Sequence, residues 1–200
     1  MAEEMVADFE GGTIEAANMG AKRIRLLQIT GGFTTDGQAL HTAKVEAARG
    51  IADGLKEVGD VSVWYARFLP EVAAVGSLLD AAGLSYRSVT GAVKRSDRSL
   101  VRNQFRRGAL QALVFQIQAG SEAIDLATAH EVVYYSLPDG WLYYWQSTRR
   151  VRGPKQKHAT RYRHILARNT LDRSVLTTLQ EKGDMHAELM RSPRAFLFGV

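Results

Sequence analysis

The stretch QIQAGSEAIDLATAHEVVYYS extends from Gln116 to Ser136. It connects the end of one apolar run to a second apolar run through a segment of small residues. The runs 112–117 and 131–137 are almost continuously apolar, as in parallel strands that are covered on both faces. Segment 118–127 carries Ala, Gly and Ser side chains that let a backbone approach a ligand. Because open α/β sheets bind ligands beyond the carboxyl ends of their strands, this segment is a candidate ligand loop. The alternative is an ordinary strand-to-helix turn.

Helical and extended patterns alternate outward from this stretch. Within 38–57, the apolar residues Ala43, Ala47, Ile51 and Leu55 recur every four residues and predict a helix that turns this face inward. The same criteria predict strands at 61–68, 85–90 and 162–167, and helices at 70–82, 98–107, from 139 and at 170–182. Such alternation indicates an α/β fold with a mainly parallel sheet flanked by helices.

One globular domain is expected, because 200 residues with 46% hydrophobic content can bury a single core. Residues 1–25 are predicted to be an N-terminal segment, 26–183 the domain and 184–200 a tail. The Gly- and Ala-rich stretch 1–37 predicts little autonomous structure, and Gly183 is expected to end the last clear helix. A short helix is then expected from Met185.

Composition narrows the functional classes. The formal net charge of +5 makes contact with a polyanion plausible, and the absence of cysteine excludes disulfides and thiolate chemistry. No apolar run approaches the roughly 20 residues of a membrane span, and the first residues are acidic where a signal peptide is basic. The histidines lack metal-ligand spacing, so no metal site is expected. A cytoplasmic protein with no membrane contact is predicted.

The segment QSTRRVRGPKQ, residues 146–156, suggests phosphate chemistry. On a helix, Gln146 and Arg150 share one face, while Arg152 extends from the helix end and Arg149 lies beside them. A forked, always-charged guanidinium can stabilise charge on a phosphoryl group in the transition state. The alternative is a solvated basic face or one that contacts nucleic-acid phosphates.

A second group of arginines is expected on the helix 98–107. Ser96 and Asp97 are N-cap residue types, Leu100, Val101 and Phe105 are expected to point inward, and the arginines outward. This stripe, which includes Arg98 and Arg102, could neutralise backbone phosphates without reading sequence, or could be an ordinary soluble face. The aromatic residues 141–145 suggest core packing more readily than base stacking.

In order, these pieces resemble the second RecA-like lobe of superfamily 2 helicases, specifically the Swi/Snf-type translocases of phage and bacteria. The resemblance covers about 26–182. RLLQITGGF resembles the start of that lobe, with Lys44 in its first helix; VSVWYARF resembles motif IV; and TGAVKRSDRSLVRNQF resembles the segment that follows. QAGSEAIDLATA stands in the place of motif V, QSTRRVRGPKQ in the place of motif VI, and YRHILARNTLDRSVLTTLQEK resembles the closing strand and helix.

The resemblance implies a RecA-like three-layer fold and roles for particular residues. Gln146 and Arg150 match motif VI directly, whereas Gly153 stands where the family has its second arginine and Arg152 lies one position earlier. Arg150 and Arg152 are therefore the candidate catalytic fingers. The candidate nucleotide contacts are Gln146, Arg149 and Asp125, and the candidate nucleic-acid contacts are Gln118, Gly120, Ser121, Arg98 and Arg102. Asp125, which replaces the family's Asn, could instead cap a helix.

The first lobe of that family, with its phosphate loop and its acidic Mg²⁺-binding box, has no counterpart in these residues, since no G-x-x-x-x-G-K-[ST] motif occurs. The resemblance therefore implies a C-terminal motor lobe that joins a first lobe in cis or in trans on double-stranded DNA. ATP and Mg²⁺ are expected to bind only in the two-lobe assembly, and the chain alone should not hydrolyse ATP. The alternative is a nucleic-acid-binding or regulatory module that keeps the fold and has no ATPase activity.

Overall fold

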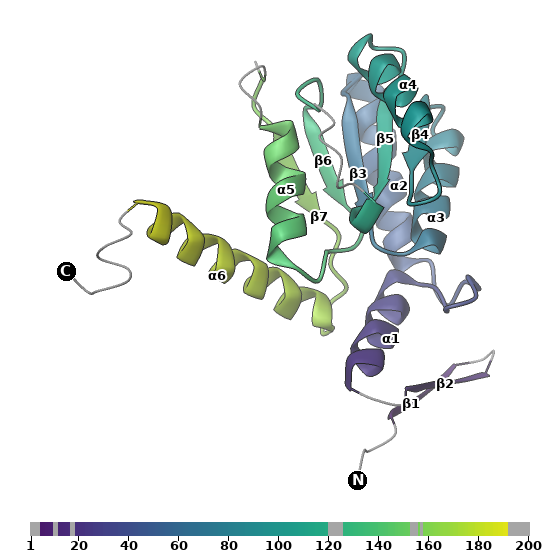
Figure 1. Cartoon of the computed structure of the whole chain (residues 1–200). Coiled ribbons are helices and arrows are strands. Elements are labelled where there is room, and N and C mark those ends of the chain that lie inside the picture. Colours follow the sequence, from purple (N-terminus) through teal and green to yellow (C-terminus); the bar gives the residue numbers. More distant parts are fainter. Residues whose placement is uncertain are drawn as a thin grey trace.

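A computed structural model describes residues 5–9, 12–16, 19–119, 126–152, 156 and 158–191 of the chain. Its centre is a parallel five-stranded sheet of order β4-β5-β3-β6-β7 (Figure 1). The strands are β3 (Ser62–Ala66), β4 (Tyr86–Val89), β5 (Ala112–Gln116), β6 (Glu131–Tyr134) and β7 (Arg161–His164). The predicted α/β fold with a parallel sheet flanked by helices is thus confirmed.

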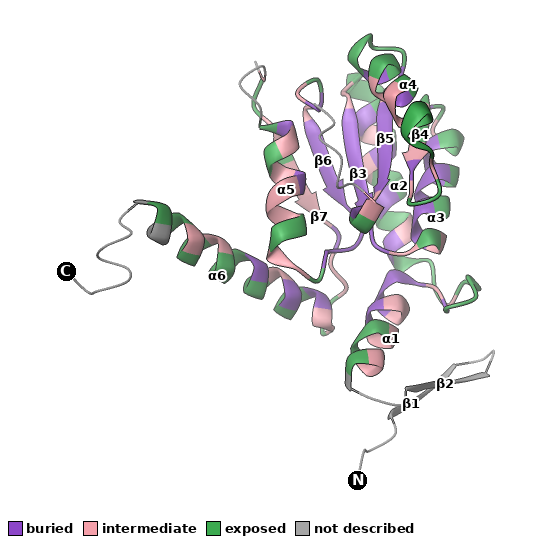
Figure 2. Cartoon of the chain, in the orientation of Figure 1, coloured by how far each residue is buried: buried purple, intermediate pink, exposed green. Residues whose placement is uncertain are grey.

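The sheet separates two apolar clusters, because side chains alternate along each strand. In β3, Val63 and Tyr65 face the cluster that includes residues of α4 and α5, whereas Trp64 and Ala66 face α2 and α3. Figure 2 shows the central strands buried from end to end. The helices are α2 (Ala43–Val58), α3 (Leu69–Ala81), α4 (Arg95–Arg106), α5 (Trp141–Val151) and α6 (Leu171–Arg191), and a 3-10 turn, η1 (Ile117–Ala119), follows β5.

The inward face of α2 is shifted by one residue from the predicted face. Ala48 and Ala52 are buried, together with Leu55 as expected, while Ala43 and Ala47 are exposed. The first buried position is Lys44, whose ammonium lies 2.6 Å from the equally buried carboxylate of Asp172 on α6. A periodicity argument scores a lysine as polar, so it could not detect a lysine that is buried because its charge is paired.

The prediction of little structure in 1–37 was wrong. A hairpin of β1 (Met5–Phe9) and β2 (Gly12–Ala16) precedes the helix α1 (Met19–Gly31). Contacts distant in sequence hold α1: Leu27 enters the core, Thr30 Oγ1 donates to Asp172 at 3.4 Å, and the Tyr135 hydroxyl donates to the Gly31 carbonyl at 2.8 Å. Tertiary packing here overrides weak local propensity.

Two helix ends also differ from expectation. α4 begins at Arg95, so Ser96 and Asp97 lie in its first turn, and Leu100 is 63% exposed while Val101 and Phe105 are buried. α6 continues through Gly183, where an added Cβ would lie 3.3 Å from Trp141 Nε1, so this glycine permits close packing on α5 instead of ending the helix. α1 and α6 cross the suggested domain bounds, 25/26 and 183/184, which stay predictions.

Candidate functional site: the arginine-bearing helix α5

α5 lies over a row of aromatic rings on one face of the sheet. Phe115, Tyr65, Tyr134 and His164 occupy the same register on the neighbouring strands β5, β3, β6 and β7. Their rings stack across the sheet, with successive centroids 5.7, 5.2 and 5.0 Å apart. Stacked rings of this kind restrict one another's motion and present their polar atoms in fixed directions.

The polar atoms of this row and of Tyr162 meet the middle of α5. The Tyr65 hydroxyl donates to the Ser147 carbonyl at 3.4 Å, and the Tyr134 hydroxyl lies 2.6 Å from the Ser147 hydroxyl. The Tyr162 hydroxyl donates to the Thr148 carbonyl at 3.1 Å. A carbonyl oxygen has two lone pairs, so the Thr148 carbonyl accepts the Tyr162 hydroxyl in addition to the Arg152 amide.

Arg150 follows this fixed turn and points toward the sheet. Its guanidinium is half-buried, and it lies close enough to Tyr65 to act on that hydroxyl: burial raises the pKa of Tyr65, and the charge of Arg150 opposes the rise. The Arg150 carbonyl accepts the Leu126 amide at 3.3 Å. Because Leu126 directly follows the candidate ligand loop, the end of α5 contacts one flank of that loop. Gln146, also half-buried, lies one turn earlier on the same face.

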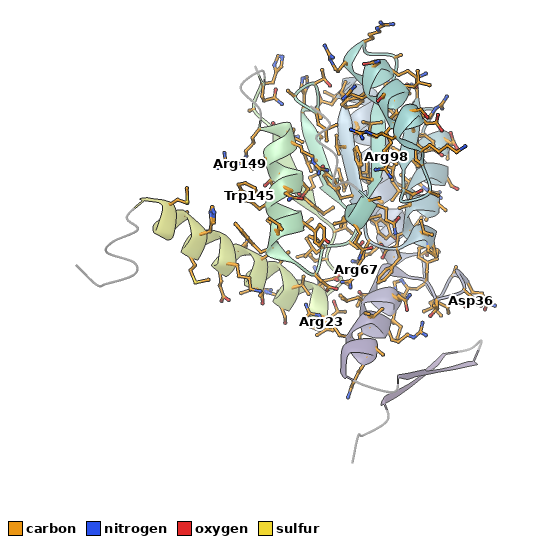
Figure 3. The ribbon with its side chains drawn as sticks, in the orientation of Figure 1. Arg23, Asp36, Arg67, Arg98, Trp145 and Arg149 are labelled. Carbon is orange, nitrogen blue, oxygen red and sulfur yellow. The ribbon has the colours of Figure 1, made fainter. Side chains whose placement is uncertain are left out.

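Arg149 and Arg152 point in other directions. Arg149 lies 5.4 Å from the centroid of Trp145, on the side of α5 away from the sheet (Figure 3). Arg152 caps the helix end, is exposed, and stacks its guanidinium 5.0 Å from the Tyr162 ring. The three arginines that are adjacent in sequence therefore lie on separate sides of α5, and Arg150 and Arg152 are the two that lie against strand tyrosines.

The other flank of the loop contacts α4. Arg98 donates to the carbonyls of Thr90, Val93 and Ala119 at 3.2, 2.9 and 3.3 Å, and so joins the start of α4 to η1. Arg98 and Arg102 are half-buried, so the expectation that both point outward was wrong. Gln118 is exposed beside this contact. Of the other predicted site residues, Gly120, Ser121 and Asp125 lie outside the described residues, as does Gly153.

A buried polar cluster at the carboxyl ends of β3 and β6 was missed in the sequence. Glu71 Oε2 accepts hydrogen bonds from the amides of Arg67 and Phe68 at 3.0 and 3.1 Å and from the Ser136 hydroxyl at 2.5 Å. Burial raises the pKa of Glu71, although these hydrogen bonds oppose the rise. An arginine that ends an apolar strand is the sequence signal that could have marked this cluster.

Arg67 is the cation of this cluster. Its side chain is 5% exposed and donates from Nη2 to Asp139, which also lies 3.6 Å from Arg23 of α1 (Figure 3). Burial lowers the pKa of Arg67 to about 10, and the nearby carboxylate of Glu71 opposes this shift. Together with the Lys44–Asp172 pair, the cluster fixes α1 and α6 against this edge of the sheet.

Over the described ranges, no group of three or more His, Asp or Glu side chains is arranged to hold a metal ion. Within the same part of the chain, no helix combines the length and apolar character needed to cross a bilayer. An anion is the ligand best suited to the α5 site, since Arg150 and Arg152 supply guanidinium donors and Gln146 an amide.

Comparisons with known proteins agree with this geometry. Residues 49–155 match the family described as helicase conserved C-terminal domain, whereas no curated protein sequence matches. The C-terminal part of the Fun30 ATPase domain aligns with a TM-score of 0.63 and 13% identity over 70% of this chain and 45% of that chain. The S. cerevisiae Dbp5 C-terminal domain, solved bound to Gle1, aligns with a TM-score of 0.52 and 19% identity over 68% and 80%. These likenesses show a RecA-like fold. The aligned part spans less than half of the Fun30 chain.

Proposed function

The chain belongs to the helicase conserved C-terminal domain family, and from this premise we propose that it is the second lobe of a Swi/Snf-type translocase on double-stranded DNA. ATP would bind between this lobe and a first lobe that carries the phosphate loop and the Mg²⁺ ligands. Arg150 is the finger that faces the γ-phosphate, Arg152 assists it, and Gln146 contacts the nucleotide. Arg149 and Asp125 are further candidate nucleotide contacts.

The observation that carries this proposal is the meeting of two motifs at α5. Arg150 presents its guanidinium from one side of the helix end, and its backbone holds Leu126 at the flank of the loop after β5. A guanidinium placed at a developing phosphoryl charge accelerates transfer by roughly 10³ to 10⁵. Nucleic acid near the loop and nucleotide near Arg150 would thus act on the same short segment of chain.

DNA contacts are proposed at the opposite flank of the same loop. Gln118 is exposed next to Ala119, and Arg98 fixes that residue to α4. Gly120, Ser121 and Arg102 complete the proposed contacts to backbone phosphates. Such contacts are independent of base sequence, as a translocase requires.

A stand-alone nucleic-acid-binding module is the second candidate function. It is favoured by the exposed cations Lys94, Arg95, Arg106 and Arg107 on and beside α4, which suit phosphate binding without any nucleotide. In this alternative, Arg150 would contribute to DNA affinity alone.

DNA-stimulated ATPase activity separates the two candidates. The chain would be assayed alone and mixed with a lobe that carries a phosphate loop, with Arg150→Ala and Arg49→Ala variants. Arg49 is exposed on α2, across the sheet from α5, so its variant controls for the loss of one positive charge. The motor proposal predicts no turnover alone, turnover on mixing, and loss of turnover with Arg150→Ala only. DNA binding without turnover in any mixture would contradict it and favour the module.

A further inference from the structure

α5 is positioned by hydroxyl groups rather than by apolar packing alone. Tyr65, Tyr134 and Tyr162 come from three neighbouring strands, and their hydroxyls meet two consecutive residues, Ser147 and Thr148. Of the apolar side chains in α5, only Val151 is buried. Trp141 and Tyr144 pack against the same core but are only partly buried, so directional contacts in the turn between Tyr144 and Val151 set the rotation of the helix about its axis.

The position of these contacts along α5 matters for the arginines. Ser147 precedes Arg150 by one turn on the same side of the helix, and Thr148 precedes Arg152 by one turn. The Thr148 carbonyl also accepts the amide of Arg152, the residue that caps the helix, at 3.3 Å. Tyr162 and Arg152 therefore bond to the same carbonyl at the end of α5. Fixing Ser147 and Thr148 therefore fixes the direction of both guanidinium groups.

We infer that the hydroxyls of Tyr65, Tyr134 and Tyr162 are positioning groups that hold α5 in the orientation from which Arg150 reaches its anionic ligand. They act through α5 and, for Tyr65, also through direct contact of its hydroxyl with the Arg150 side chain. The expected effect on ATP turnover rests on the proposed function. The effect on α5 itself does not, because it belongs to this chain alone.

Tyr65 carries the sharpest test, because its ring is wholly buried between Phe115 and Tyr134 and Tyr65→Phe removes one oxygen without opening a gap beside those rings. Tyr135→Phe is a matched control. Tyr135 directly follows Tyr134, the last residue of β6, and is as buried as Tyr65. It faces the other side of the sheet, where its hydroxyl donates to the Gly31 carbonyl at 2.8 Å. Both variants lose one buried hydroxyl hydrogen bond to a backbone carbonyl, and Tyr65→Phe also loses the contact with the Arg150 side chain.

Backbone hydrogen exchange of the full chain measures the effect without any partner. In Tyr65→Phe, the amides of 148–152 should exchange roughly five times faster, relative to the amides of β3 in the same variant, which corresponds to one hydrogen bond. Tyr135→Phe should leave this ratio unchanged. An equal ratio in the two variants would overturn the inference, whether or not the chain has a motor function.

Turnover in the two-lobe assembly is the second readout. Tyr65→Phe should lower kcat by about fivefold to tenfold while KM for ATP stays within about twofold, because the finger acts in the transition state. Tyr135→Phe should leave both constants unchanged. An unchanged kcat in Tyr65→Phe would overturn the positioning role. If no mixture turns over ATP, the proposed function fails, and hydrogen exchange alone decides the inference.

Discussion

The helices α4 and α5 lie on the same face of the sheet and carry similar arginine-rich segments, yet they are held differently. α4 rests on the apolar side chains of Val101 and Phe105, and its Arg98 is occupied by carbonyls of the neighbouring loops. α5 rests on Val151 and the partly buried Trp141 and Tyr144, and strand tyrosine hydroxyls also bond to its backbone on the side from which Arg150 faces the sheet. Similar numbers of arginines therefore do not mean similar surroundings, because Arg98 is bonded to three carbonyls whereas Arg150 lies beside a tyrosine hydroxyl.

The largest expected effect is on catalysis. In the two-lobe assembly with saturating DNA, Arg150→Ala on α5 should lower kcat by roughly 10³ to 10⁵, because the transition state loses its guanidinium. Arg102→Ala on α4 should leave kcat near that of the wild type. Steady-state ATPase assays compare them, and similar losses in the two variants would erase the distinction between the helices.

The free energy of unfolding should depend more on the contacts under α4 than on the hydroxyls under α5. Phe105 is 1% exposed under α4, so Phe105→Ala should lower the free energy of unfolding by about 3 to 5 kcal/mol through lost burial and a cavity. Tyr134→Phe under α5 removes one hydrogen bond and should cost about 1 kcal/mol. Urea unfolding measures both. A larger loss from Tyr134→Phe would mean that the hydroxyl stabilises the whole lobe instead of orienting one helix.

Salt dependence of DNA binding should distinguish the outer face of α4. Replacing exposed Arg95 and Arg106 with Ala removes two cations that can release counterions, so the slope of log K against log salt should become shallower by up to about 1.8. Arg49→Ala on α2 should leave the slope unchanged. Fluorescence anisotropy with a duplex at several salt concentrations gives the slopes, and identical slopes would remove α4 from the DNA contacts.

The smallest expected effect is a pH dependence confined to α5. Burial lowers the pKa of His164, which ends the aromatic row and lies 2.9 Å from the Tyr144 hydroxyl. On acidification, His164 is protonated in the unfolded chain at a higher pH than in the folded chain. The contribution of neutral His164 to the free energy of unfolding is therefore complete above about pH 6.5 and is lost as the pH falls through the lowered pKa. Exchange of α5 amides relative to α4 amides should rise on acidification in the wild type and rise less in His164→Gln. α4 amides are the internal reference.

Much of the fold was predictable because it is local in sequence. The buried strand 62–66 and the helix α3, which has Pro70 in its first turn, follow from an apolar run and a helix-start residue. α1 was missed because Thr30 and Gly31 are held by residues more than a hundred positions away. The burial of Lys44 was likewise not predicted, because its partner, Asp172, lies at the other end of the chain.

The candidate site was predictable to the level of the helix and not to the level of its side chains. Spacing placed Gln146 and Arg150 on one face of a helix, and the helix is confirmed. Helical spacing is sufficient to bring Arg149 to Trp145, four residues earlier on α5, but it could not predict that Arg98 bonds to Ala119, because that contact depends on how neighbouring elements pack. The tyrosine contacts to Ser147 and Thr148 depend on strand order, which no local pattern encodes.

The most direct test of the central claim is a structure of this chain assembled with a phosphate-loop lobe and an ATP transition-state mimic, in which the distance from the Arg150 guanidinium to the γ-phosphate mimic is measured. The account predicts a hydrogen-bond distance of roughly 2.7 to 3.2 Å, with the hydroxyls of Tyr65 and Tyr162 still on α5. An Arg150 guanidinium that stays away from the mimic while another residue contacts it would contradict the account.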